Sequence, residues 1–166
     1  MIQADSGKLN PAEPGDFCAG ERKLTRQMPI AFTPIGFVEN PANEVPRHWT
    51  VSDLEGTLVI QPKFVAGLSD IKAGERIVVL FHFHQSNTFT SADLRQAKRK
   101  DGRIMGVFSI CSPRRPNPIG LSVVQVVAVD QGRIHVKGLD MYDGTPILDI
   151  KPYVSAESSK ANAGPQ

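Results

Sequence analysis

Residues 121–139 have the sequence LSVVQVVAVDQGRIHVKGL, in which two apolar stretches flank the polar segment 130–132. In the second stretch, Ile134 and Val136 alternate with His135 and Lys137, which is the period of a half-buried strand. A short glycine-containing segment between two such stretches is typical of a β-hairpin. These residues therefore predict two antiparallel strands over 121–129 and 133–139.

Five further apolar stretches are bounded by Gly, Pro or polar residues, and we expect strands over 32–38, 57–60, 76–84, 104–110 and 147–150. Helical patterns are short, with one near 44–48 and one near 92–98. Many short strands separated by Gly and Pro indicate a closed barrel or a sandwich. The expected fold class is therefore mainly β, with a few short helices.

The length of 166 residues and the 40% hydrophobic content indicate a single globular domain. We expect a folded body over 30–154, a flexible N-terminal arm over 1–29 and a flexible tail over 155–166, because both ends lack periodic apolar residues. No signal-peptide pattern or membrane-length apolar stretch is present, so the expected location is the cytoplasm. Cys18 and Cys111 fit no zinc spacing and are interpreted as free thiols.

The segment 112–122, SPRRPNPIGLS, contains three prolines and two arginines between apolar strands. Proline fixes its own backbone and restricts the preceding residue, so this loop is expected to be stiff and extended. Arg114 and Arg115 could then meet phosphate or carboxylate groups of a ligand. The alternative is a rigid connector with solvated arginines.

His82 and His84 lie two residues apart, so a strand through them would place both on one face. Such a pair occurs in cupin-type metal sites, which need further ligands. Only His48 and His135 remain, and neither has a ligand spacing. We therefore predict no metal, and interpret the pair as strand histidines or as a polar contact at a strand end.

Three aspartates, Asp140, Asp143 and Asp149, lie within ten residues beside a strand. The sequence Asp-Gly-Thr-Pro at 143–146 is a good turn by itself. The carboxylates could alternatively bind ribose hydroxyls or a cationic ligand. No Rossmann glycine pattern or P-loop is present, so any nucleotide-like cofactor is held in another way.

A run of basic residues at 95–103 is interrupted by a single acid, Asp101. It could be a solvated face, or it could join the arginines at 114 and 115 in a stripe that attracts phosphate. The residues expected to contact RNA are Arg95, Lys98, Arg99, Lys100, Arg114 and Arg115, with Arg103 beside them. The single tryptophan, Trp49, would stack on a base if exposed and belong to the core if buried.

These segments together resemble the TsaA-like family. The resemblance covers about residues 30–154 and rests on PIG at 34–36, GLSDI at 67–71, FHQS at 83–86, GVF at 106–108, RPNPIGLS at 115–122, DGTP at 143–146 and DIKPY at 149–153. It implies a small single-sheet β-barrel that forms a homodimer. It also implies binding of S-adenosylmethionine near the dimer interface. The implied activity is methylation of the N6 atom of threonylcarbamoyladenosine, beside the anticodon in tRNA.

The resemblance also implies which residues contact the cofactor. The expected contacts are Pro46, Arg47, His48, His84, Gln85, Cys111, Leu121, Asp140, Asp143, Gly144 and Thr145. Cys111 stands where some bacterial members have an arginine, so either Arg114 or Arg115 takes over that contact or the contact is lost.

Methyl transfer of this kind needs a group that accepts the proton of the substrate nitrogen, and Asp143 or His84 is the expected acceptor. The competing class is a small barrel that binds nucleic acid without catalysis. A cupin-like metal enzyme that uses His82 and His84 is the third interpretation.

Overall fold

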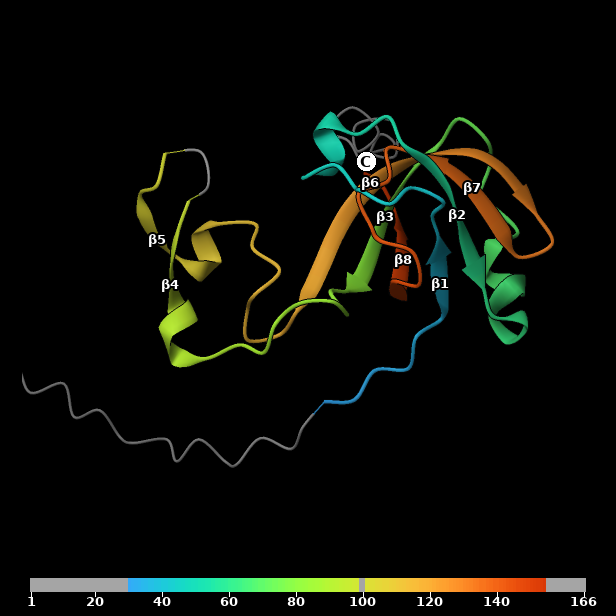
Figure 1. Cartoon of the computed structure of the whole chain (residues 1–166). Coiled ribbons are helices and arrows are strands. Elements are labelled where there is room, and N and C mark those ends of the chain that lie inside the picture. Colours follow the sequence, from blue (N-terminus) through green and yellow to red (C-terminus); the bar gives the residue numbers. More distant parts are fainter. Residues whose placement is uncertain (1–29, 99–100, 155–166) are drawn as a thin grey trace, which may run out of the picture. The chain divides into compact units, whose positions relative to one another are not determined.

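The computed structural model describes residues 30–98 and 101–154 (Figure 1). The strands are β1 (Gly36–Glu39), β2 (Glu55–Ile60), β3 (Arg76–His82), β4 (Arg95–Ala97), β5 (Ile104–Gly106), β6 (Ile119–Asp130), β7 (Arg133–Lys137) and β8 (Pro146–Pro152). The helical segments are the 3-10 turns η1 (Trp49–Val51), η2 (Pro62–Leu68), η3 (Ser91–Leu94) and η4 (Val107–Ser109). The mainly β prediction is confirmed. The flexible segments expected at 1–29 and 155–166 lie outside the described residues.

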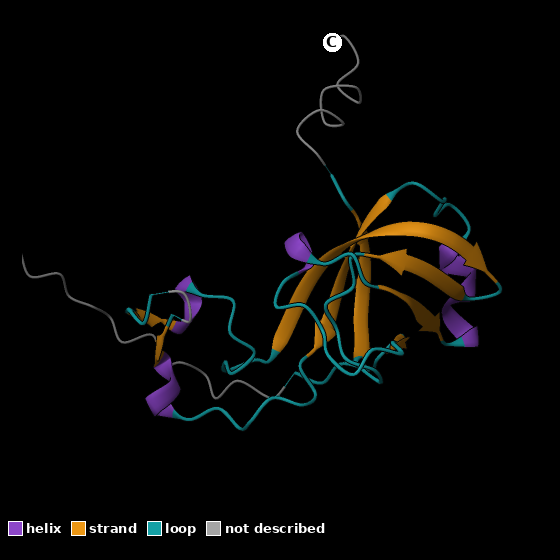
Figure 2. Ribbon diagram, turned by 45° about the horizontal axis from the view of Figure 1, so that its top comes forward, coloured by secondary structure: helices purple, strands orange, loops and turns teal. Residues whose placement is uncertain are grey.

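Six strands pair in the order β1-β2-β7-β6-β3-β8, and β8 pairs back to β1, so that the sheet closes into a barrel (Figure 2). All neighbouring strands in this barrel are antiparallel. The short strands β4 and β5 form a separate antiparallel pair within the β3–β6 connection (residues 83–118). No helix of the described segments is long and apolar enough to cross a membrane.

The β6–β7 hairpin confirms the interpretation of residues 121–139. Asp130 pairs with Arg133, and the two residues between them, Gln131 and Gly132, have φ values of 41° and 88°. Positive φ at both positions is the geometry of a type I′ turn, which matches the twist of the flanking strands. Glycine adopts this conformation without the steric cost that a side chain brings.

Alternate strand residues fill the barrel, as the period of two requires. The fully buried side chains include Val38 of β1, Leu58 of β2, Val79 of β3, Ile134 of β7 and Ile147 of β8. Burying each such side chain stabilises the fold by about 1.5–3 kcal/mol relative to leaving it exposed. The barrel core thus holds in place the strand ends from which the long connections leave.

Gly120 allows a close approach between β3 and β6. It pairs directly with Phe81, whose ring lies across it. A Cβ atom at position 120 would lie 2.2 Å from Cζ of that ring. The glycine of the RPNPIGLS segment is therefore required by packing at the start of β6.

Several expected element boundaries are wrong. The strand expected over 76–84 ends at His82, because the His84 amide donates to the His82 carbonyl at 2.8 Å and closes a tight turn. His84 is therefore outside the strand, and the expected shared strand face of the two histidines does not exist. The strand expected over 104–110 ends at Gly106, where η4 begins.

The expected helical turns also differ from the structure. Residues 44–48 contain no helix, and the turn falls on η1 instead. The segment expected over 92–98 divides into η3 and strand β4.

Candidate functional site

Three long connections join the strands of the barrel. They join β1 to β2 (residues 40–54), β3 to β6 (residues 83–118) and β7 to β8 (residues 138–145). The first and third of these begin or end level with the start of β3, because Arg76 and Lys137 both pair with Gln125 and Lys137 pairs with Glu55. The β3–β6 connection leaves at the other end of β3, where His82 pairs with Ile119. All the expected cofactor contacts lie on these connections, except Leu121, which lies near the start of β6.

Hydrogen bonds join the 40–54 and 138–145 connections into one unit. The side-chain amide of Asn40 donates to the Met141 carbonyl at 2.8 Å, and the Asn40 backbone amide donates to Oδ1 of Asp143 at 2.9 Å. The hydroxyl of Ser52 donates to the Leu139 carbonyl at 2.5 Å, and the Leu139 amide donates to the Leu54 carbonyl at 3.0 Å. Segments about 90 residues apart in sequence thus form one surface.

Asp140 lies at the centre of this unit. Its Oδ1 accepts a hydrogen bond of 2.5 Å from the hydroxyl of Ser122, a fully buried residue of β6. Burial raises the pKa of Asp140, while the hydrogen bonds from Ser122 and from the Trp49 backbone, together with the His48 charge, act in the opposite direction. The carboxylate therefore ties the 138–145 connection to β6.

His48 and Trp49 form an aromatic pair beside Asp140. Nδ1 of His48 accepts a hydrogen bond from the Thr50 amide at 3.3 Å, which caps η1. The His48 and Trp49 rings stack with their centroids 5.3 Å apart. Trp49 is half-buried, so it is neither fully core nor fully exposed.

Residues 143–146 form the turn that their sequence predicts. Gly144 has φ 72°, and its amide donates to the Val38 carbonyl at 2.8 Å. The hydroxyl of buried Thr145 donates to the Tyr142 carbonyl at 2.7 Å. Asp143 is exposed, and one of its oxygens already accepts the Asn40 amide.

The expected cofactor contacts divide into two groups. Pro46, Arg47, His48, Asp140, Asp143, Gly144 and Thr145 lie on the joined connections. His84, Gln85 and Cys111 lie on the β3–β6 connection and are exposed. Within residues 30–98 and 101–154, no hydrogen bond joins the second group to the first. Leu121 faces outward from β6 and is 53% exposed.

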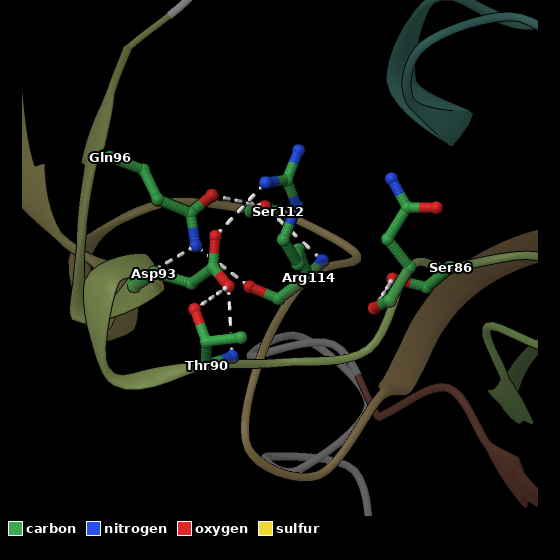
Figure 3. A network of polar contacts seen from close by, with 7 residues as sticks. Ser86, Thr90, Asp93, Gln96, Ser112 and Arg114 are labelled. Atoms are coloured by element: carbon green, nitrogen blue, oxygen red, sulfur yellow. Dashed lines mark hydrogen bonds and ion pairs between the residues drawn. The ribbon is translucent and has the colours of Figure 1, made fainter.

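A polar network organises the β3–β6 connection (Figure 3). Asp93 accepts the backbone amide and the hydroxyl of Thr90, each at 2.9 Å, and forms an ion pair with Arg114 at 3.0 Å. The Thr90 amide, together with the Thr90 hydroxyl and Arg114, lowers the pKa of Asp93. The side-chain amide of Gln96 donates to the Arg114 carbonyl, and the Ser112 hydroxyl donates to the Gln96 side chain.

This network assigns different positions to the two arginines of the RPNPIGLS region. The Arg114 guanidinium is engaged with Asp93, while Arg115 donates to the Ser112 carbonyl at 3.3 Å. Arg95 and Arg103 are exposed on or beside the β4–β5 pair. Arg99 and Lys100 lie outside the described residues. The fold therefore brings the two expected basic segments into one connection.

The basic character of the chain is concentrated in this connection. Residues 83–118 contain seven Lys and Arg against two Asp, whereas the whole chain contains 19 and 17. The remainder of the chain is thus net acidic. All the basic residues of the stripe expected from sequence lie within this connection.

A cleft of about 540 Å³ lies against the barrel wall. It is lined by Glu39, Asn40, Pro41, Glu55, Gly56, Thr57, Val127, His135, Val136 and Asp143. Of the expected cofactor contacts, only Asp143 lines this cleft. No group of three or more metal-ligating side chains occurs among the described residues, so no third ligand accompanies the His82–His84 pair there.

Sequence reasoning missed four residues that organise the site. Asn40 and Ser52 join the two connections, Ser122 holds Asp140, and Asp93 holds Arg114. Asp93 had a local signal, since Thr90 three residues earlier forms a capping box with it. The other three depend on partners far away in sequence.

Comparison with known proteins adds to this geometry. The chain is 38% identical over 129 residues to a probable S-adenosyl-L-methionine-binding protein of Pyrococcus abyssi, covering 75% of this chain and 68% of that protein. It is 38% identical over 99 residues to the tRNA (adenine(37)-N6)-methyltransferase of Rattus norvegicus, covering 60% of this chain and 23% of that protein.

Solved structures are similar as well. The crystal structure of TrmO from Pseudomonas aeruginosa aligns with a TM-score of 0.63 at 34% identity, over 82% of this chain and 60% of that chain. The sequence model for the tRNA-methyltransferase O N-terminal domain matches residues 38–158, which cover most of the length of this protein. The chain therefore belongs to the tRNA-methyltransferase O family.

Proposed function

We propose that this protein is an S-adenosylmethionine-dependent tRNA methyltransferase of the cytoplasm, acting on N6 of threonylcarbamoyladenosine beside the anticodon. The observation that carries this proposal is the hydrogen-bonded unit of the 40–54 and 138–145 connections around Asp140, on a chain of this family. Its similarity to an S-adenosyl-L-methionine-binding protein of Archaeoglobus fulgidus and to the tRNA (adenine(37)-N6)-methyltransferase of Rattus norvegicus supports it.

The joined connections offer groups that fit the cofactor. Asp140 and Asp143 supply carboxylate oxygens suited to hydroxyl groups or to a nearby positive charge. The His48–Trp49 pair supplies an aromatic surface, and Pro46, Arg47 and the 143–145 turn flank it. When bound, the cofactor supplies a methyl group carried on a sulfonium. The protein binds and orients the cofactor and the substrate, and it excludes water from the site.

His84, Gln85 and Cys111 belong to the same proposed site, and a homodimer would bring them to it. In one chain, no hydrogen bond among the described residues connects them to the joined connections. The β3–β6 connection also exposes Ile104 at 53% and Phe108 at 77%. Apolar side chains exposed to this degree beside a polar segment suit an interface with a second copy.

Asp143 or His84 is the proposed acceptor for the proton on the substrate nitrogen. Asp143 is exposed and keeps one oxygen that does not accept the Asn40 amide. His84 is exposed next to Gln85, with 3.3 Å between its Nε2 and the Gln85 side-chain nitrogen.

The β3–β6 connection is the proposed tRNA contact. Its excess of basic residues supplies the attraction to phosphate that RNA binding needs. Arg95, Lys98, Arg99, Lys100 and Arg115 are the proposed contacts, and Arg114 holds the loop shape through Asp93.

The decisive experiment is methyl transfer from labelled cofactor to tRNA isolated from cells that lack this gene, followed by nucleoside analysis. We expect label in N6-methylated threonylcarbamoyladenosine, loss of transfer in Asp143→Asn or in His84→Ala, and normal transfer in the surface control Lys63→Ala. Calorimetry with the cofactor accompanies the assay. A purified, folded protein without measurable cofactor binding would contradict the proposal.

A second candidate is a nucleic-acid-binding module without catalysis, which the charge of the β3–β6 connection favours. This candidate predicts that substitution of Asp140 or Asp143 leaves tRNA binding unchanged and that the protein has no affinity for the cofactor. The same calorimetry and a tRNA titration distinguish the two candidates.

A further inference from the structure

Arg76, the first residue of β3, lies between two aromatic rings on the barrel wall. Its guanidinium carbon is 4.4 Å from the centroid of the Tyr153 ring and 5.8 Å from that of Trp49. The Tyr153 amide donates to the Arg76 carbonyl at 3.2 Å, which fixes the backbones of this pair. The residue after β8 and the first residue of η1 thus both contact this cationic side chain at the start of β3.

This arginine carries a charge that no described carboxylate neutralises. The ion pairs of residues 30–98 and 101–154 are Arg114–Asp93, Arg133–Glu39 and Lys151–Asp149, and none includes Arg76. Its pairing partner on β6 is Gln125, which is uncharged, and the neighbouring Glu75 carboxylate accepts the Lys72 amide. Stacking against aromatic faces leaves the N–H edge of a guanidinium available for another acceptor.

Arg76 also lies close to the candidate site. Trp49 follows His48, which is one of the proposed cofactor contacts, and the two rings stack with their centroids 5.3 Å apart. The aromatic ring that contacts the guanidinium therefore belongs to the element that borders the proposed cofactor site.

We propose that Arg76, held between Trp49 and Tyr153, binds a phosphodiester of the RNA substrate. This inference rests on the proposed function for the identity of the RNA. The planar guanidinium edge matches two phosphate oxygens, and the exposed parts of Trp49 and Tyr153 offer apolar contact to the adjoining nucleotide. Arg76 is separate in sequence from the basic β3–β6 connection, so the arginine and the connection would bind the RNA at two points.

The test compares Arg76→Ala and Arg76→Lys with Lys63→Ala. Lys63 is a matched control, because its amine also lies over an aromatic ring, Phe64 at 4.8 Å, but on η2. Binding of tRNA to the full chain is titrated over a range of salt concentrations, and cofactor affinity and thermal unfolding are measured for each variant. These last two measurements identify any variant that is misfolded.

We expect Arg76→Ala to reduce the slope of log K against log salt by about 0.7, the value for one phosphate contact on single-stranded RNA. At 0.1 M salt this corresponds to tRNA binding about fivefold weaker, with a matching rise in KM for tRNA. Arg76→Lys should retain most of the slope, because the charge remains, and should still bind more weakly than wild type, because the planar fork is lost. Lys63→Ala should match wild type.

An Arg76→Ala protein that is folded and keeps the wild-type slope and affinity would overturn the inference. An equal effect from Lys63→Ala would also overturn it, since that would indicate that only the overall positive charge of the protein contributes to tRNA binding. If wild type binds tRNA but transfers no methyl group, the proposed function fails while the Arg76 measurement still stands, so the two failures are distinguishable.

Discussion

Replacing Gly120 by alanine tests the packing that positions the RPNPIGLS segment. The added Cβ would lie 2.2 Å, 2.4 Å and 2.8 Å from three ring carbons of Phe81, all closer than the 3.0 Å below which real Cβ contacts essentially never fall. The ring has little room to move, because Phe81 is 3% exposed and meets the Phe83 ring edge-on at 5.0 Å. Gly120→Ala should therefore strain the β3–β6 pairing directly.

Overpacking of this kind costs about 1–3 kcal/mol. At about 4 °C per kcal/mol for a domain of this size, the melting temperature should fall by roughly 4–12 °C. Urea unfolding followed by the fluorescence of Trp49 measures the change in unfolding free energy directly. The slope of that free energy against urea concentration should not change. Gly106→Ala is the matched control, since nothing lies within 4 Å of its added Cβ, and it should stay within about 0.5 kcal/mol of wild type.

A double-mutant cycle locates the cause. Phe81→Leu alone removes part of the ring volume and destabilises the core, but in the Gly120→Ala background it also relieves the clash. The double mutant should therefore be more stable than the sum of the single effects by about 1 kcal/mol or more. Strict additivity, or a Gly120→Ala protein as stable as wild type, would refute the packing argument.

Three further outcomes are expected. Gly132→Ala should destabilise the protein more than Gly74→Ala does. Both positions have positive φ, 88° and 91°, but the added Cβ at position 132 would lie 2.7 Å from the Val65 side chain, whereas position 74 faces open space. The cost of Gly74→Ala, about 1 kcal/mol, therefore reports the backbone alone, and equal urea midpoints for the two variants would contradict this. Because the pKa of Asp140 is raised in the folded state, the protein should lose stability as pH rises above the ordinary value of 3.8, and Asp140→Asn should remove that loss when unfolding is measured between pH 3 and 7. Asp93→Asn should speed tryptic cleavage at Arg95 and Arg103, because it removes the ion pair with Arg114. The melting temperature of the barrel should stay near that of wild type. An unchanged cleavage rate would show that this ion pair does not hold the β3–β6 connection.

The strands of the barrel could be predicted where the local signal was complete. Ile134 and Val136 alternate with polar residues, and Gln131-Gly132 supplies the positive φ of the turn, so the β6–β7 hairpin follows from adjacent residues. The end of β3 at His82 could not be predicted, because the apolar pattern continues to Phe83 while a single local hydrogen bond turns the chain.

The candidate site shows the same division. The 143–146 turn follows from its own residues, and the resemblance supplied the positions on the 40–54 and 138–145 connections. The contacts that join these connections, such as Asn40 to Met141 and Ser122 to Asp140, link residues that are 101 and 18 positions apart. Strand β4 was missed because it is short and polar, and a network around Asp93 supports it instead of apolar alternation, whereas its partner β5 lies within the strand expected over 104–110.

The β3–β6 connection is organised by polar contacts and has almost no hydrophobic interior. Of its described residues, only Asp93 and Val107 are buried. A segment with so little buried apolar surface opens at a lower free energy than the strands it links. Deuterium should therefore replace the amide protons of β4 and β5 well before those of β3 and β6, and any molecule that docks on the connection would slow this exchange by selecting one conformation from its native-state fluctuations.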